Sequence, residues 1–331
     1  MKKIAMSFFI LSSSTGWAMQ AMDDAAMTQV TAQDGVSIGI QLPDSTLSFN
    51  QINLVDTDGT NDMNQAASLV IAPTTNNTTQ GVRFFNASNT PTQQAISINI
   101  DAGANAANQS TANINVALPQ DLSRIRINPL SIYLAPGRGE IFTARKVDLT
   151  TTNSVRTNVR EILQIGEQGM DIVFKSGEAV GFNLQFGHED QGHLLKFSSG
   201  TLLCVANNAM CVTGNSDDGS NPIQVHSVEG SSLKFGFKLS ASNQTTGLRL
   251  YDHDGAGGFS GFYGDIDSQG LLIGADGTMD KFDLTLTNIT MGDKTAVPNT
   301  NTFNGLNNGS MGNIGLTGVQ VTDFKATIRG M

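Results

Sequence analysis

Short apolar segments in which every second residue is hydrophobic recur along this chain, and they constrain its fold more than any other feature. In the first, Val36, Ile38, Ile40 and Leu42 alternate with polar or small residues, and such period-two alternation indicates a half-buried β-strand. Later segments repeat the pattern, among them Ile96–Ile100, Ile114–Leu118, Phe182–Phe186, Leu233–Leu239 and Phe282–Ile289. Gly, Asn or Asp follows almost every segment and favours a turn. Regularly spaced short strands predict an all-β protein.

The strands are expected to build a single elongated body over residues 43–331, either a β-solenoid-like stack or an extended β-sandwich. No exact internal repeat is present. The stretch from Val155 to Ile165 also admits a helical turn, and Gly315 to Ile328 suggests a final strand with a kink near Asp323.

The composition agrees with exposed strands and tight turns. Charged residues make up only 15% of the 331 residues, while Gly contributes 35 and Pro 8. Helix surfaces favour Ala, Glu, Lys and Arg instead. The chain has 19 basic and 29 acidic residues, a net charge of −10. An acidic surface repels nucleic acid and anionic lipid, so neither is an expected partner.

The start of the chain resembles a secretory signal peptide. Lys2 and Lys3 precede an apolar run from Ile4 to Trp17 and small residues from Ala18 to Ala21. Residues 1–21 are the predicted signal peptide, with cleavage after Ala18 or Ala21. The run is shorter than the roughly 20 apolar residues that cross a bilayer, so no membrane span is expected. We expect export through the periplasm to the cell surface or the exterior.

A short helix is predicted directly after the signal peptide, from Met22 to Gly35. Asp23 is a suitable cap, Met22 and Met27 are spaced as a hydrophobic staple, and Gly35 ends the segment. Together with the first strand this helix makes up residues 22–42, ahead of the main body.

The two cysteines, Cys204 and Cys211, are predicted to form a disulfide bond. Apolar residues flank an Asn207-Asn208 pair between them, which favours a hairpin turn. Nearby cysteines in an exported chain most simply pair. Closing this eight-residue loop contributes about 2.5 kcal/mol in the chain-entropy picture.

No catalytic constellation emerges, and we expect no enzyme and no catalytic residue. Gly35-Val36-Ser37-Ile38-Gly39 matches the Gly-x-Ser-x-Gly pattern, but it lies inside a predicted strand, without the strand-to-helix turn that a nucleophile elbow needs. The cluster from His188 to His193 contains two histidines and two carboxylates in no standard metal spacing.

Among the acidic turns, Asp252 and Asp254 are the best candidates for binding a calcium ion as cofactor. Asp-x-Asp segments also form ordinary turns. No segment completes a twelve-residue calcium loop.

The first alternating strand is a candidate for strand addition. Val36, Ile38, Ile40 and Leu42 lie close to the mature N-terminus, where an apolar strand can complete a neighbouring subunit's sheet. The alternative is that this strand is simply the first of its own sheet.

The segment from Met22 to Ile38 resembles the mature start of the FilA-type pilus assembly proteins of gammaproteobacteria and their β-rich relatives. An Asp23-Asp24 pair, a short apolar helix and Gln33-Asp34-Gly35 carry the resemblance, with Ala32 where a glycine is common. A looser likeness extends to Asp56–Gly59 and Gly312–Gly318. The C-terminus, Arg329-Gly330-Met331, lacks the penultimate aromatic residue of chaperone–usher pilins.

The resemblance implies a surface fibre or its assembly, and no catalytic residue. The expected function is therefore a non-catalytic structural subunit or assembly component of a pilus or fimbria that supports adhesion, with other pilus subunits, assembly proteins or its own copies as partners. The alternative is a secreted monomeric module that binds carbohydrate or a surface receptor.

Overall fold

The computed structural model describes residues 35–329 with several gaps. The gaps are residues 43, 57–66, 74–80, 105–106, 137–149, 152–153, 156–158, 167–168, 189–190, 208–222, 228–230, 256–257, 294–301, 304–305 and 308. The chain divides into the units Met1–Gly35 and Val36–Met331, and every described strand belongs to the second. The predicted signal peptide and, apart from Gly35, the predicted helix lie outside the described residues.

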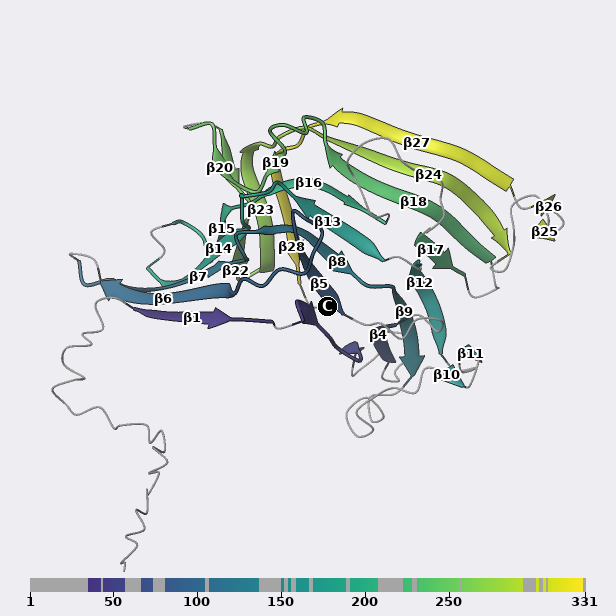
Figure 1. The fold of residues 1–331 in the computed structure, drawn as a ribbon, viewed down its shortest axis with the longest axis horizontal. Coiled ribbons are helices and arrows are strands. Elements are labelled where there is room, and N and C mark those ends of the chain that lie inside the picture. Colours follow the sequence, from purple (N-terminus) through teal and green to yellow (C-terminus); the bar gives the residue numbers. More distant parts are fainter. Residues whose placement is uncertain are drawn as a thin grey trace, which may run out of the picture. The chain divides into compact units, whose positions relative to one another are not determined.

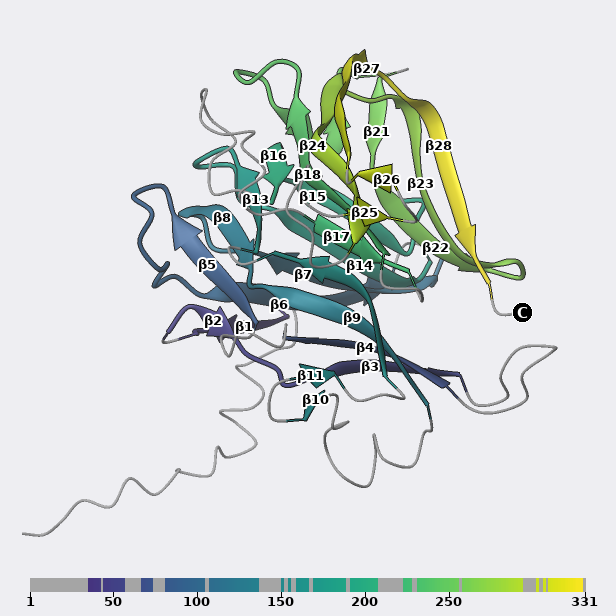
Figure 2. The same ribbon diagram turned by 90° about the vertical axis from the view of Figure 1, so that its right-hand side faces the viewer.

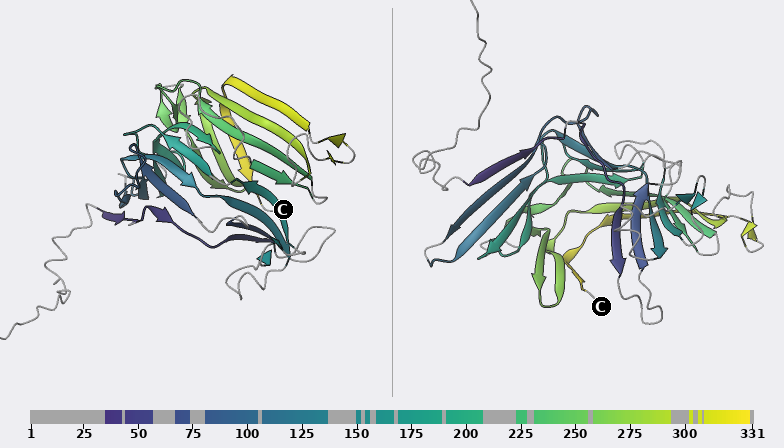
Figure 3. Two further views of the ribbon diagram at one scale, coloured as in Figure 1. Left: turned by 45° about the vertical axis from the view of Figure 1, so that its right-hand side comes forward. Right: turned by 90° about the horizontal axis from the view of Figure 1, so that it is seen from below.

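All regular elements of the described residues are β-strands, as the period-two pattern predicts (Figure 1). The all-β class is thereby confirmed. Each pairing between these strands is antiparallel. The strands curl into a half-barrel (Figures 2 and 3), and neither the solenoid-like stack nor the extended sandwich is confirmed.

One sheet has eight strands in the order β1-β6-β7-β14-β15-β22-β23-β28. Their bounds are β1 Val36–Ile40, β6 Ile96–Ala104, β7 Ser110–Ala117, β14 Gly181–Gly187, β15 Leu195–Ser199, β22 Tyr263–Asp267, β23 Gly270–Thr278 and β28 Thr322–Ile328. The first and the last strands of the chain thus lie at the two edges of the same sheet.

A second sheet has fourteen strands, and its main path runs β2-β5-β8-β13-β16-β18-β17-β12-β9-β4-β3. Their bounds are β2 Thr46–Leu47, β3 Ile52–Asp56, β4 Ala67–Pro73, β5 Val82–Asn86, β8 Leu122–Ile127, β9 Leu130–Pro136, β12 Arg160–Ile165, β13 Met170–Phe174, β16 Thr201–Ala206, β17 Ile223–His226 and β18 Ser231–Ala241. The other members are β19 Leu248–Arg249, β24 Phe282–Asp293 and β27 Gly309–Val319. Along its other side the long strand β18 pairs with β24, which in turn pairs with β27.

Three two-stranded sheets complete the described fold. They are β10 Thr150–Thr151 with β11 Ser154–Val155, β20 Tyr251–His253 with β21 Phe259–Gly261, and β25 Thr302–Phe303 with β26 Leu306–Asn307.

The core lies where the two large sheets meet. One buried cluster joins Phe84 and Phe174 of the fourteen-stranded sheet to partly buried Phe197 of the eight-stranded sheet. Another joins Ala241 of β18 to Ala275 of β23. Burial of aliphatic and aromatic side chains is the main driving force for holding such layers together.

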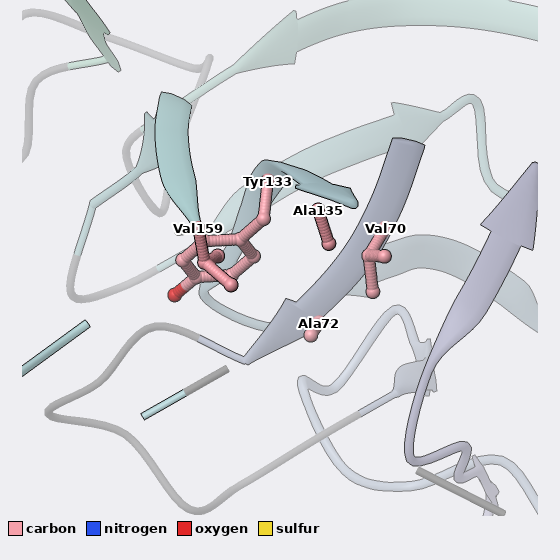
Figure 4. Close-up of a cluster of buried hydrophobic side chains, with 5 residues drawn as sticks. All are labelled: Val70, Ala72, Tyr133, Ala135 and Val159. Atoms are coloured by element: carbon pink, nitrogen blue, oxygen red, sulfur yellow. The ribbon is translucent and has the colours of Figure 1, made fainter. Parts of the chain in front are cut away.

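A third cluster lies on β4 and β9 and includes the residue directly before β12, and Figure 4 shows its members. They are Val70, Ala72, Tyr133, Ala135 and Val159. Burial, with the negative charge of Glu161 nearby, raises the pKa of Tyr133 to about 12.

The structure corrects three expectations about single elements. All five residues of β1 are exposed, although alternation predicts a half-buried strand, because β1 lies at the edge of its sheet and has a described strand partner on one side only. The described part of the stretch from Val155 to Ile165 contains the end of β11 and all of β12, and no helical turn. The final segment is two strands in different sheets, since β27 ends at Val319 and β28 begins at Thr322.

Candidate interaction edges

Strand β1 forms one edge of the eight-stranded sheet. It pairs with β6 through five consecutive residues without a register shift. Its other side has no strand partner among the described residues. Val36, Ile38 and Ile40 are 57%, 42% and 41% exposed, so the apolar side chains of this edge face solvent.

Strand β28 forms the opposite edge of that sheet. It pairs with β23 regularly from Phe324 to Ile328, and the one register shift comes before this stretch. Phe324 and Ile328 are exposed, and so is Lys325, whose Nζ lies 3.3 Å from Oδ1 of Asp276. The hydrogen bond with Asp276 raises the pKa of Lys325.

The two faces of the eight-stranded sheet differ in chemistry because side chains alternate along each strand. One cross-strand row takes a residue from each strand and is aliphatic except for one glycine: Val36, Ile100, Ile114, Leu184, Leu195, Gly264, Ile273 and Ala326. The neighbouring row on the other face is mostly polar: Ser37, Asn99, Asn115, Asn183, Lys196, Tyr263, Gly274 and Lys325. In the polar row Ser37 donates a hydrogen bond to Asn99 at 2.7 Å.

The fourteen-stranded sheet also carries an aliphatic face that the described residues leave partly uncovered. Its cross-strand neighbours form the row Ile52, Ile71, Ile132, Leu163, Val225, Leu233 and Met291. Leu54 and Leu134 lie on the same face, two residues further along β3 and β9, and are 71% and 44% exposed. Large exposed apolar patches are typical of interaction surfaces in folded proteins.

Strand β27 is a further edge without charge. Its eleven residues contain no Asp, Glu, Lys or Arg, and Met311, Ile314 and Leu316 are more than half exposed. Three register shifts interrupt its pairing with β24. Such irregularities twist an edge away from partners, so β27 is better protected than β1.

A charged cluster lies on β5, β8 and β13, at the polar face of the fourteen-stranded sheet. Arg126 donates two hydrogen bonds to Asp171, at 2.7 and 2.8 Å, and Asp171 is 2% exposed. Arg83, Arg124 and Arg126 all lie over the Phe85 ring, at 4.3 to 5.9 Å from its centroid. The hydrogen bonds that Arg126 donates to Asp171 raise the pKa of Arg126.

An open, polar pocket of about 520 Å³ lies beside Arg249. Arg249 donates hydrogen bonds of 2.9 and 2.8 Å to the two carboxylate oxygens of Asp280. Burial by itself would raise the pKa of Asp280, but the hydrogen bonds from Arg249 outweigh it and hold that pKa below its usual value. Asp254, Lys281 and Gln320 also line the pocket.

The structure places the four residues predicted for strand addition in two environments. Val36, Ile38 and Ile40 belong to β1 and pair within their own sheet. Leu42 follows the strand and packs, partly buried, against the cluster around Phe84. Three of the four are therefore available at an open edge, while Leu42 anchors the end of the strand.

Asp252 and Asp254, the calcium candidates, each have a cationic neighbour. Asp252 lies 3.7 Å from Lys196, and Asp254 lies 3.4 Å from Arg249 and 3.5 Å from His253. Among the described residues no group of three or more His, Cys, Asp or Glu is placed to hold a metal ion. Calcium at these two residues stays a prediction.

The remaining candidate residues are only partly described. Cys204 is fully buried on β16, whereas Cys211 lies outside the described residues, and their disulfide stays a prediction.

In the cluster from His188 to His193, Glu189 and Asp190 lie outside the described residues. His193 stacks on Tyr263 with centroids 3.6 Å apart and lies 2.8 Å from Asp265.

Sequence reasoning proposed strand addition at one edge strand of the eight-stranded sheet, which stays a prediction, and proposed nothing for the strand at the other edge. The alternation of Phe324, Ala326 and Ile328 marks a strand, but only the pairing with β23 makes it an edge. The cluster around Phe85 was missed too. Its one sequence signal is the alternation of Arg124 and Arg126 on β8, which places both on one face.

Comparisons with known proteins give one match. A family described as a family of unknown function (DUF6160) matches residues 1–104. The comparison with curated proteins finds no match, and the comparison with solved structures finds none either. None of the described residues forms a helix of the length and apolar character that crossing a membrane takes.

Proposed function

We propose that this chain is a structural subunit or assembly component of a bacterial surface pilus or fimbria, works without catalysis and supports adhesion. The observation that carries the proposal is the open edge strand β1. Its five residues, Val36 to Ile40, include no charge and no proline, and its apolar side chains are exposed.

Such an edge favours association with another chain. Proteins that stay monomeric protect their sheet edges with charges, prolines or bulges, because free N–H and C=O groups are a template for a further strand. β1 has none of these devices over its five regular pairs. Complete burial of an exposed aliphatic side chain contributes about 1.5–3 kcal/mol. Val36, Ile38 and Ile40 are 41–57% exposed, so a neighbouring strand would supply a part of this for each of them.

Other features of the sequence support a role outside the cell. The signal peptide predicts export, and a disulfide between Cys204 and Cys211 would add durability there. The resemblance of residues 22–38, with its short helix, to FilA-type pilus assembly proteins points to a surface fibre. Mature protein taken from the periplasm should show no free thiol and should begin at Met19 or Met22.

For the architecture of the subunit we favour the extended sandwich over the solenoid-like stack. The described pairs are antiparallel, whereas successive coils of a parallel β-helix pair in parallel. Two large sheets joined by buried side chains of both layers fit a sandwich whose ends stay open.

Negative-stain microscopy of sheared surface material tests the proposal. Cells that produce the chain should yield fibres that bind an antibody against it, and cells that lack the chain should not. Chain recovered only as a monomer in the medium, with fibres unchanged in its absence, would contradict the proposal.

The alternative, a secreted monomeric binding module, draws its support from the pocket beside Arg249. Its lining combines charged and amide side chains, and no aromatic residue is among the lining residues that the structure describes. Sugar-binding sites commonly use aromatic stacking, so a polar or charged ligand suits this pocket better than a sugar ring. A monomer whose thermal midpoint rises with a bound surface receptor, and falls back with Arg249→Gln, would favour this alternative.

A further inference from the structure

We propose that copies of this chain join head to tail through the eight-stranded sheet, with β28 of one copy adding antiparallel to β1 of the next. This inference rests on the proposed function, which it makes specific. The occupant of each open edge is a second copy of the same chain.

The directions of β1 and β28 allow this contact. All seven pairings between β1 and β28 are antiparallel, so direction reverses at every step across eight strands. An even number of strands leaves β1 and β28 running in opposite directions. A second copy placed alongside in the same orientation therefore presents its β1 antiparallel to β28, and the alternation of the sheet continues across the contact.

The two edges also match in length and regularity. β1 offers the five consecutive positions that pair regularly with β6. β28 offers five consecutive positions, Phe324–Ile328, that pair regularly with β23. Neither stretch contains a register shift, so each is straight enough to accept a full ladder from the other.

Side-chain chemistry then selects the register. Pairing Ile38 with Ala326 places Val36 opposite Ile328 and Ile40 opposite Phe324, so the aliphatic face continues without a break. On the other face Ser37 meets Thr327 and Gly39 meets Lys325. A slip by one residue would move Lys325 to the aliphatic face. A sheet with one aliphatic and one polar face strongly disfavours such a slip, because it transfers every side chain of the strand to the wrong face.

Gly39 gives Lys325 the space that this register needs. A glycine leaves the position opposite the long lysine side chain empty, and its nearest neighbour in its own copy is Cβ of Ala95, 3.7 Å from where a Cβ would lie. Lys325 already has Asp276 as its counter-ion. The contact therefore buries no unpaired charge.

This contact is heterologous, because it joins two different edges. A heterologous contact repeats from copy to copy and builds an open filament unless rotation closes a ring. β28 carries Asp323 and Lys325 and is a poor partner for itself, whereas the uncharged β1 also permits a two-fold β1–β1 contact. The experiment must separate these two arrangements.

Cysteine cross-linking in the surface material provides that test. In the proposed register Ser37 and Thr327 lie directly opposite, and opposed residues on antiparallel strands have Cβ atoms about 4.5–5.5 Å apart, within reach of a disulfide after a small adjustment. Both are exposed in the isolated copy. The full chain carrying Ser37→Cys and Thr327→Cys together should give a ladder of multimers on a non-reducing gel, which reductant collapses to monomer.

The controls define what contradicts the inference. Each single variant should give no ladder, and neither should Ser37→Cys combined with Leu54→Cys, whose second position lies on β3 of the other sheet. Dimers from Ser37→Cys alone would show the two-fold arrangement and overturn the inference. Fibres without a ladder in the double variant would overturn it while leaving the proposed function intact. Absence of any fibre that contains the wild-type chain would overturn both.

A second variant guards against altered folding of the cysteine variants. Ile38→Lys places a charge at the β1 edge, and Ile314→Lys places the same charge on β27 at a similarly exposed aliphatic position. We expect Ile38→Lys to abolish fibres while the thermal midpoint stays close to that of the wild type, and Ile314→Lys to leave fibres in place. Normal fibres from Ile38→Lys would overturn the inference.

Discussion

Asp171 shows how one side chain decides the stability of a charged cluster. Its carboxylate is 2% exposed, accepts two hydrogen bonds from Arg126 and lies 3.7 Å from Arg124. Burial lowers the pKa of Arg124, and the charges of Arg126 and Arg83 act in the same direction. With three arginines stacked on one ring, Asp171 is the nearby anion that balances them.

Replacing Asp171 by Asn should therefore destabilise the fold by about 3 kcal/mol, because it leaves buried guanidinium groups without a counter-charge. Denaturant unfolding measures the loss. Asp252→Asn is the matched control, since Asp252 is 60% exposed and 3.7 Å from Lys196, and an exposed pair contributes at most about 1 kcal/mol. Equal effects of the two substitutions would contradict the assignment.

Asp280 predicts how stability changes with acid. Arg249 holds its pKa in the folded chain below the unfolded value of about 3.9. The contribution of this group to stability is therefore fully present above about pH 4 and is lost as pH falls through the lower folded pKa. In thermal unfolding from pH 6 to pH 2, Asp280→Asn should flatten the fall of the midpoint below pH 4, and an unchanged profile would contradict this.

At the scale of single elements, tight connections fix where strands begin. Gly169 precedes β13 with a φ of 79°, and a Cβ there would lie 2.0 Å from the carbonyl oxygen of Ile127 on β8. Gly177 follows β13 with a φ of 81°, and a Cβ there would meet no atom within 4 Å. The two glycines share a backbone conformation and differ in the space around them.

Gly177→Ala should cost about 1–2 kcal/mol, the ordinary penalty of a left-handed conformation. Gly169→Ala should cost at least about 1–3 kcal/mol more, because β8 and β13 must separate to admit the methyl group. Urea unfolding of both variants gives the difference directly. Equal losses would mean that the backbone at Gly169 relaxes freely.

The positions of individual strands could be predicted from the sequence more readily than the pairing between strands. Alternation is a local signal, and it located β1, β6 and β18 because their apolar residues recur at every second position. Pairing depends on distant residues, as when Val36 meets Ile100. The segment from Gly315 to Ile328 reads as one strand for the same reason, although its halves join different sheets. The local sequence pattern therefore could not predict that β28 forms an edge of the sheet or that Arg126 contacts Asp171.

At the scale of the whole molecule, like charge opposes the association that the edges favour. Cleavage of the predicted signal peptide would remove Lys2 and Lys3 and leave 17 basic against 29 acidic residues, a net charge of −12. Copies therefore repel one another at long range. The proposed contact strip itself holds one charged residue, Lys325, so its attraction is mainly apolar and hydrogen-bonded.

Assembly should accordingly strengthen with salt. Raising ionic strength from about 0.01 M to 0.15 M shortens the screening length from about 30 Å to 8 Å, which removes most of the repulsion and leaves the contact unchanged. Sedimentation or light scattering of the mature chain at both salt concentrations measures the shift toward larger species. Dissociation by added salt would indicate an association held by opposite charges instead.

For a chain that is exported as we propose, the positions of β1 and β28 would also set the order of events during secretion. The eight-stranded sheet needs the last residues of the chain to gain its final strand, while its first strand emerges at the outset. A chain still threading through the export machinery cannot yet display the second docking edge. In the proposed assembly, polymerisation would then start only after translocation is complete, and premature growth inside the cell would be avoided.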